Sequence, residues 1–486
     1  MLNRRRLLAL GAITGGAMVL PFSRLTAEGA DDTVPLRRQD LIPRAPRAAA
    51  RSAVAPFSVR MPVPQELRPA WSGPDHDLYK IAVKPANLEI LPGLTTPLLT
   101  YGGTFVGPTI RARTGRPAKV VFVNQLDRPT NVHLHGAHVP AVSDGHPMET
   151  IDPGRFRSYD YPNAQQGTTL WYHDHSHHME AEHVYRGLHG MYVIDDPAER
   201  RLRLPDGPYD VPIFLRNAQF DENGGLVFFS PYDRTTILAN GRPQPYFPVA
   251  ARKYRFRLVN GANEYTFRLT LGGAEFQQIA SDGGLLPAPV PLTELVLGSA
   301  QRADIVVDFA RYPVGTQVVL TDAASGAPVL RFDVVRQAWD DSRVPDVLRP
   351  LPPMPAATVR REVSMRFGYT ETDVFGLVND KQFDPNRVDF RIKRGDTEIW
   401  TLTNGDSDQG IEHTFHMHLV QFRVLDRNGA PPRPWDAGLK DTIQLPPNET
   451  VRVQATFRNY LGRYVYHCHY LEHSSLGMMA QMEVVP

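Results

Sequence analysis

A ten-residue pattern occurs three times along this 486-residue chain, and it constrains the fold more than any other feature. Each copy starts at a turn, continues as a run that alternates between apolar and polar residues, and closes on an asparagine. The copies are residues 115–124, 251–260 and 395–404. Because one unit recurs at wide spacing, we predict an all-β protein built from three related β-sandwich domains.

Two further repeats distinguish the outer thirds of the chain from the middle third. Residues 414–419 contain a His-x-His pair, whereas the matching residues 266–271 have lost both histidines. The similar place in the first third holds the His-x-His pair of residues 133–135. Another element occurs twice, as Trp-Tyr-His-Asp-His at 171–175 and as Val-Tyr-His-Cys-His at 465–469. We therefore expect functional histidines in the first and third domains and none in the second.

Proline-rich stretches near residues 197–205 and 345–355 mark the predicted domain boundaries. The predicted organisation is an export signal over residues 1–30, a flexible lead-in rich in Pro, Ala and Arg over 31–60, and domains over 61–200, 201–350 and 351–486.

The N-terminus has the features of an export signal. Arg4, Arg5 and Arg6 precede an apolar stretch over Leu7–Phe22 that is too short and too rich in small residues for a membrane span. Adjacent arginines favour a twin-arginine export signal over an ordinary secretory signal or a membrane anchor. We expect a periplasmic or extracellular protein without stable membrane insertion. A formal net charge of +1 gives no reason to expect a nucleic-acid partner.

Ten of the 17 histidines lie in four clusters, and each cluster contains a His-x-His pair. Residues i and i+2 of a strand point to the same face, so each pair offers two imidazoles side by side. Four pairs supply eight nitrogen ligands, which suit copper better than calcium, magnesium or manganese. A structural zinc site needs only four ligands. The clustered histidines are His133, His135, His173, His175, His413, His416, His418, His467, His469 and His473.

Cys468 is the sole cysteine of the chain and stands between His467 and His469. On a strand the two histidines face one way and the cysteine faces the other, so one short segment reaches two metal sites. His413, His473 and Met478 complete a set of two His, one Cys and one Met on the cysteine side. This is the ligand set of a blue-copper electron-transfer site.

These motifs resemble those of the multicopper oxidases, and the order of motifs is most similar to the three-domain bacterial laccases, which include the spore-coat laccase and bilirubin oxidase branch. The resemblance extends from about residue 60 to the C-terminus. It implies cupredoxin-like Greek-key domains and four copper ions, with a three-copper cluster between the first and third domains. By resemblance, the type 1 copper is held by His413, Cys468, His473 and Met478, the type 2 copper by His133 and His416, and the type 3 pair by His135, His173, His175, His418, His467 and His469.

The family reaction couples four one-electron oxidations of a small reductant to reduction of O₂ to two waters, and this consumes protons. Asp144 occupies a position where related enzymes carry an acid near the cluster, which makes it a candidate proton relay. The dipeptide Asp144-Gly145 equally fits a simple turn. Many relatives have Glu-Asp directly after the second type 1 histidine, whereas this chain has Ser474-Ser475. Nearby Glu472 is interpreted as facing solvent.

Three functions are compatible with these motifs. The first is a laccase-like enzyme that acts on phenols, aromatic amines or tetrapyrrole pigments. The second is a metallo-oxidase for Cu(I) or Mn(II), which needs carboxylates or thioethers beside His413 or His473. The third is a copper-free structural protein on the same fold, which the complete ligand set argues against. Because one chain supplies both halves of the cluster, a monomer suffices. The remaining histidines, among them His177, His178, His183 and His189, are interpreted as solvated or bonded to the backbone.

Overall fold

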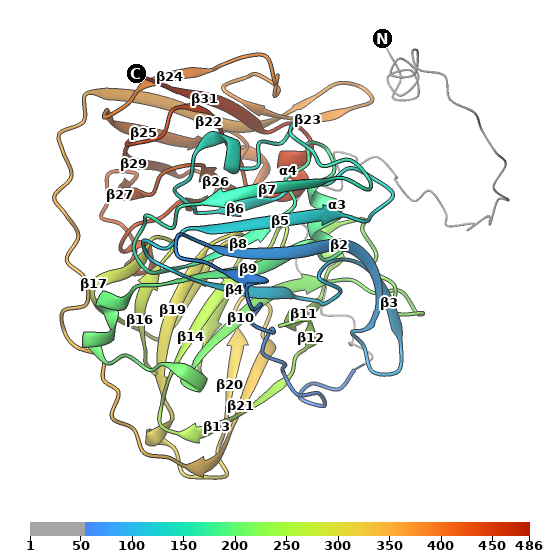
Figure 1. Cartoon of the computed structure of the whole chain (residues 1–486), viewed down its shortest axis with the longest axis vertical. Coiled ribbons are helices and arrows are strands. Elements are labelled where there is room, and N and C mark those ends of the chain that lie inside the picture. Colours follow the sequence, from blue (N-terminus) through green and yellow to red (C-terminus); the bar gives the residue numbers. More distant parts are fainter. Residues whose placement is uncertain (1–53) are drawn as a thin grey trace, which may run out of the picture. The chain divides into compact units, whose positions relative to one another are not determined.

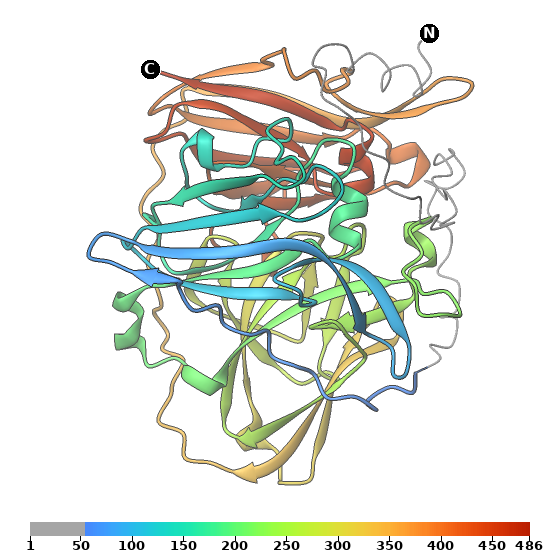
Figure 2. The same cartoon turned by 45° about the vertical axis from the view of Figure 1, so that its right-hand side comes forward.

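A computed structural model describes residues 54–486, and within them six β-sheets stack in pairs (Figures 1 and 2). The prediction of an all-β protein with three β-sandwich domains is confirmed. The predicted signal over residues 1–30 lies outside the described residues. Within residues 54–486 no helix is both long enough and apolar enough to cross a membrane.

The first sandwich pairs a five-stranded sheet with a four-stranded sheet. The larger sheet has the order β1-β2-β5-β7 with β3 paired to β2, and the smaller sheet has the order β4-β9-β8-β6. The strands are β1 (Trp71–Ser72), β2 (Asp77–Glu89), β3 (Thr95–Tyr101), β4 (Gly107–Arg113), β5 (Ala118–Asn124), β6 (His133–His135), β7 (Phe156–Tyr161), β8 (Thr168–His173) and β9 (His189–Asp195).

The second sandwich pairs a seven-stranded sheet, β12-β11-β10-β14-β19-β16-β17, with a five-stranded sheet, β13-β21-β20-β15-β18. Its strands are β10 (Asp210–Ala218), β11 (Thr236–Ala239), β12 (Arg242–Pro243), β13 (Tyr246–Ala251), β14 (Lys253–Asn260), β15 (Phe267–Thr270), β16 (Phe276–Ser281), β17 (Gly284–Leu292), β18 (Glu294–Leu297), β19 (Arg302–Asp308), β20 (Gln317–Asp322) and β21 (Ala327–Gln337).

The third sandwich pairs two five-stranded sheets, β23-β22-β25-β29-β27 and β24-β31-β30-β26-β28. Its strands are β22 (Val359–Tyr369), β23 (Val374–Val378), β24 (Phe390–Lys393), β25 (Thr397–Asn404), β26 (His413–Met417), β27 (Phe422–Arg427), β28 (Thr442–Leu445), β29 (Thr450–Thr456), β30 (Gly462–Cys468) and β31 (Met479–Val485).

The three sequence repeats form β5, β14 and β25, which take equivalent places in their sheets. Each pairs in parallel with one strand and antiparallel with another. The closing asparagines Asn124, Asn260 and Asn404 are buried and make the same bonds: each side-chain amide donates to two backbone carbonyls, and its oxygen accepts from the N–H two residues on. The asparagines therefore satisfy backbone groups where the chain leaves the sheet.

Each sandwich has its own apolar core. The three largest clusters of buried apolar residues centre on Val120 and Tyr159 in the first domain, Phe256 in the second, and Trp400 and Phe415 in the third. Strand alternation places these side chains between the two sheets, as the alternating sequence pattern predicts. Just ahead of the first domain, the backbone N–H groups of residues 57 and 61 donate to carbonyls of residues 244 and 246 in the second.

Two short α-helices lie next to each other at the contact between the first and third domains (Figure 1). They are α3 (Glu180–Tyr185), which follows β8, and α4 (Leu471–Ser475), which follows β30. Short 3-10 helices occur at η1 (Ala141–Ser143), η2 (Pro197–Leu202), η3 (Gly207–Tyr209), η4 (Pro231–Asp233), η5 (Phe309–Arg311), η6 (Ser407–Gln409) and η7 (Pro434–Asp436).

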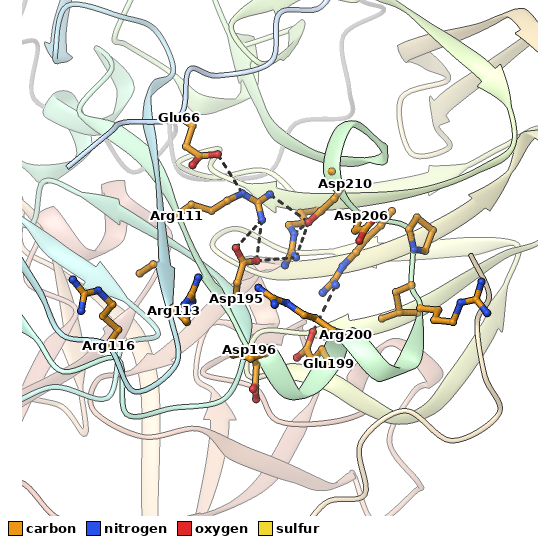
Figure 3. Close-up of a pocket in the computed structure, with 18 of the residues that line it drawn as sticks. Glu66, Arg111, Arg113, Arg116, Asp195, Asp196, Glu199, Arg200, Asp206 and Asp210 are labelled. Carbon is orange, nitrogen blue, oxygen red and sulfur yellow. Dashed lines mark hydrogen bonds and ion pairs between the residues drawn. The ribbon is translucent and has the colours of Figure 1, made fainter. Parts of the chain in front are cut away.

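A cleft of about 580 Å³ separates the first two domains, and charged side chains line it (Figure 3). Arg111 reaches toward Glu66, Asp195 and Asp210, with Nη1 2.9 Å from an Asp195 oxygen and Nη2 3.3 Å from Asp210. Arg257 also pairs with Asp210, at 2.7 Å. Seven arginines and seven acids line the cleft, so its charges balance, and none of the clustered histidines borders it.

Candidate metal centre

Strand pairing brings the predicted histidines together. β6 pairs with β8 in the first domain, so that His133 lies opposite His173. β26 pairs with β30 in the third domain, so that His416 lies opposite His467. Because i and i+2 share a face, both His-x-His pairs of each domain converge on the domain interface.

Three groups of buried histidines result, and within each group one ring nitrogen per residue lies within 4.8 Å of the others. The first and third domains both contribute to every group. The groups are His133, His135 and His416; His135, His173 and His469; and His175, His418 and His467. The eight histidines expected to bind the three-copper cluster are therefore assembled in one place.

Most of these imidazoles use one nitrogen for a protein partner and leave the other facing the group. The Nδ1 atoms of His133, His173 and His416 lie 2.6–2.8 Å from backbone carbonyl oxygens. Their Nε2 atoms are buried and have no hydrogen-bond partner, as is also the case for both nitrogens of His469. Unpaired buried nitrogens are costly unless something binds them, so this donor set fits metal ions coordinated by imidazole.

The charge state of the imidazoles also fits a metal. Burial, reinforced by His175, lowers the pKa of His173 and His467 to about 3. Burial and neighbouring imidazoles hold the pKa of His133, His416 and His469 well below the usual value. These rings are therefore neutral near pH 7, and the neutral imidazole is the form that binds metal.

The cysteine forms a second site on the other side of β30. Cys468 Sγ lies 3.7 Å from His413 Nδ1 and 3.5 Å from His473 Nδ1, and these two nitrogens are 3.1 Å apart. Burial raises the pKa of the thiol, but His473 and His413 outweigh it and lower the pKa to about 6. The cysteine therefore favours the thiolate, which is the ligand form.

Outer partners fix both histidines of this site. His413 Nε2 lies 3.0 Å from Asp406, and His473 Nε2 lies 3.5 Å from Glu264 of the second domain. Each ring thus directs Nδ1 at the thiol. Met478 is fully buried in the same core cluster as Cys468, and its carbonyl accepts from the Cys468 N–H at 3.0 Å.

Asp144 lies at the edge of the histidine groups and is almost fully buried. Its Oδ2 is 2.7 Å from His418 Nδ1, and its backbone carbonyl accepts from His133 Nδ1 at 2.6 Å. Burial raises the pKa of its carboxyl to about 8. The turn is present as well, since Gly145 has a φ of +81° and a Cβ there would lie 2.0 Å from the Val132 carbonyl oxygen. The turn expected at this dipeptide is therefore present, and the carboxyl of Asp144 lies beside the histidine groups.

Several residues that the sequence motifs do not include contact the clustered histidines. Asp441 lies 3.0 Å from His135 Nε2, and Arg302 of the second domain pairs with both oxygens of Asp441. Glu180 Oε2 lies 2.9 Å from His175 Nδ1. None of these residues belongs to a motif, and each is distant in sequence or lies on another element, so no local pattern could have indicated them.

The interpretation of the remaining histidines as solvated or bonded to the backbone is wrong for His183 and His189, which are buried and contact other side chains. His183 pairs with Asp174 at 3.1 Å, and His189 stacks on Phe214 and lies 3.3 Å from Arg216. His178 Nδ1 lies 2.8 Å from a backbone carbonyl, and His177 packs against the ring of Phe383.

The solvent-facing interpretation of Glu472 is wrong. The residue is 2% exposed, pairs with Arg234 at 2.7 Å and accepts a hydrogen bond from Asn263 at 3.1 Å. The carboxylate fixes α4 to the second domain, and this contact depends on residues more than 200 positions away that the sequence pattern around Glu472 does not reveal.

Comparison with known proteins places this architecture in a family. Multicopper oxidase sequence families match residues 82–199, 224–328 and 352–486. A laccase of Bacillus stratosphericus is 35% identical, with 88% of this chain and 99% of the relative covered. The bilirubin oxidase of Albifimbria verrucaria is 34% identical, with 87% and 80% covered. The crystal structure of the laccase from Pediococcus acidilactici Pa5930 superposes with a TM-score of 0.82 at 31% identity, over 92% of this chain and 99% of that one.

This chain belongs to the multicopper oxidase family, and its sandwiches are cupredoxin-like domains. It is a copper-dependent oxidoreductase of laccase type that passes electrons from a reducing substrate to O₂.

Proposed function

We propose that the chain oxidises phenols or aromatic amines one electron at a time and reduces O₂ to water with four copper ions. The proposal depends on the position of Cys468. Its side chain faces His413 and His473, whereas its neighbours His467 and His469 belong to the histidine groups. A single backbone segment thus joins the site that receives electrons to the site that uses them.

The proposed ligands follow the grouping of the side chains. The type 1 copper is bound by His413, Cys468, His473 and Met478, the type 2 copper by His133 and His416, and the type 3 pair by His135, His173 and His469 on one side and His175, His418 and His467 on the other. When bound, these ions supply one-electron transfer and the four-electron reduction of O₂.

The protein holds the neutral imidazoles in a fixed arrangement from which bulk water is excluded. The proposed ligand histidines are at most 1% exposed, so bulk water does not contact them. Backbone carbonyls and the Asp441 carboxylate orient the rings, and Arg302 fixes Asp441 from the second domain. The second domain therefore contributes to the centre without contributing a proposed ligand.

Asp144 is proposed as the proton relay. Its Oδ2 contacts His418 Nδ1, and its Oδ1 is buried without a hydrogen-bond partner. The carboxyl can therefore hold a proton at the edge of the cluster and release it toward the site where water forms.

The proposal also covers the export of the chain, its domain limits and its oligomeric state. The adjacent arginines of the N-terminus support export by a twin-arginine system, and the domain limits at residues 61–200, 201–350 and 351–486 remain predictions. Because both halves of the proposed cluster come from one chain, the protein is proposed to act as a monomer.

One observation favours a second candidate, a metallo-oxidase. Glu264 lies 3.5 Å from His473 Nε2, and a carboxylate beside a type 1 histidine is the feature that metal-ion oxidation needs. However, Tyr232 donates to Glu264 at 3.0 Å, so one oxygen of that carboxylate is already engaged.

O₂ uptake by the copper-loaded protein separates the candidates. Under matched conditions, a phenol and Cu(I) are supplied in turn. Faster uptake with the phenol supports the laccase-type proposal, whereas uptake dominated by Cu(I) supports the metallo-oxidase. An absence of uptake with both, at full copper content, contradicts both.

A further inference from the structure

Glu180 is a fully buried carboxylate with no part in the chemistry proposed above. It lies at the start of α3, five residues after His175, and its Oε2 is 2.9 Å from His175 Nδ1. A buried carboxylate is stable only with charged or hydrogen-bonding partners, so this contact with a proposed copper ligand needs a reason.

A second contact extends from Glu180 to the third domain. The Ser474 side chain lies close enough to the Glu180 carboxyl to act on it, and Ser474 Oγ also lies 3.4 Å from His467 Nδ1. Ser474 belongs to α4 and is itself fully buried. One carboxylate therefore connects the outer nitrogens of two histidines that come from different domains.

The inner nitrogens of the same rings meet on the opposite side. His467 Nε2 lies 3.2 Å from His175 Nε2 and 3.3 Å from His418 Nε2. Because Nδ1 is paired with the Glu180 carboxylate, Nε2 is the nitrogen of His175 left to bind a metal, and a rotation of the ring would break this ion pair. Glu180 thereby selects the tautomer and the orientation of His175.

The two helices hold this arrangement rigid. The Ala181 N–H lies 3.2 Å from Ser475 Oγ, and His178 Nδ1 lies 2.8 Å from the Ser475 carbonyl oxygen. The start of α3 is thus fastened to the end of α4 beside the Glu180–Ser474 contact.

We propose that Glu180 is a positioning residue that, through His175 and Ser474, fixes the His175, His418 and His467 group for one copper ion. This inference rests on the proposed function, because it takes these three histidines as copper ligands. It adds a residue from outside the sequence motifs and a physical link between the first and third domains at the metal.

Copper affinity tests the proposal on Glu180→Gln, with Glu182→Gln as the matched control. Glu182 lies on the same helix, carries the same charge and pairs only locally with Arg186 at 2.6 Å. Each protein is loaded with copper and titrated with a chelator, and copper per chain, blue absorption and thermal unfolding of the copper-free form are recorded. In Glu180→Gln we expect one copper to be lost about 10- to 100-fold more readily, with blue absorption retained. Glu182→Gln should match the wild type.

A swap variant distinguishes positioning from general damage. Because Ser474 contacts Glu180, a carboxylate at position 474 can reach the same space, so Glu180→Ser combined with Ser474→Glu should recover copper affinity that Glu180→Ser alone loses. The inference is overturned if Glu180→Gln binds copper with wild-type affinity. It is also overturned if the loss of copper affinity is fully explained by a lower stability of the copper-free form. A wild-type protein that fails to bind four copper ions would instead count against the proposed function.

Discussion

The Asp144 carboxylate lies 2.7 Å from His418 Nδ1, although the two residues are 274 positions apart in the chain and belong to different domains. This contact places an acid beside the proposed cluster without making it a ligand. An amide at the same position keeps the shape of the side chain but cannot hold and release a proton.

Asp144→Asn is therefore expected to lower kcat for O₂ reduction by about 100-fold, the lower end of what a positioned acid contributes. Copper content and blue absorption should be unchanged. O₂ uptake at saturating phenol is the measurement. Asp160→Asn, at an exposed site of the same domain, is the control. A kcat equal to that of this control would remove Asp144 from the proton route.

Asp441→Asn is expected to destabilise the copper-free protein. Asp441 and Arg302 form a fully buried pair at 2.5 Å. Loss of the Asp441 charge leaves Arg302 with the more distant Asp282 carboxylate, at 3.7 Å, so we expect a cost of about 3–5 kcal/mol. Denaturant unfolding measures this change, with Asp341→Asn at an exposed ion pair as the control. An Asp441→Asn variant as stable as the control would show that the Asp282 carboxylate alone compensates the charge of Arg302.

Asn260→Ala tests whether the asparagine that closes each of the three sequence repeats stabilises its domain. Its amide donates to the carbonyls of Tyr265 and Leu297, and its loss leaves buried acceptors unpaired, at about 1–3 kcal/mol each. The melting temperature should therefore fall. Copper per chain should stay the same, because no proposed ligand lies in the second domain. A normal melting temperature would show that the closing asparagine is dispensable.

Asp210 makes stability depend on pH. Burial raises the pKa of its carboxyl, but Arg257 and Arg255 outweigh burial and hold the folded-state pKa well below the usual value. Since the unfolded pKa is about 3.9, the stabilisation is complete above it and is lost as the pH falls toward the folded pKa. The difference in unfolding free energy between wild type and Asp210→Asn should be constant from about pH 7 to pH 5 and shrink below about pH 4. A constant difference down to about pH 2.5 would contradict this assignment.

Local patterns were sufficient to predict the three repeated strands and the histidines that come together in the structure. The alternation around Gly115, Ala251 and Gly395 predicts β5, β14 and β25, and the i, i+2 spacing of His133 and His135 predicts a shared face. These predictions succeed because strand geometry depends on neighbours in sequence.

The residues that support the ligands could not be predicted in this way. Arg302 reaches Asp441 across a domain interface, and Glu180 reaches Ser474 between two helices that are almost 300 residues apart in the chain. Glu472 shows the same limit, because its burial is decided by Arg234 of the second domain. Tertiary contacts of this kind have no periodic signal in the sequence.

Cys468 is proposed to bind one copper while its histidine neighbours bind others. The most direct test is to count copper per chain and record blue absorption in the wild type and in Cys468→Ser. We expect four copper ions and a blue protein for the wild type, and about three copper ions, no blue colour and no turnover for Cys468→Ser. A blue Cys468→Ser variant, or one that retains four copper ions and full turnover, would contradict this proposal.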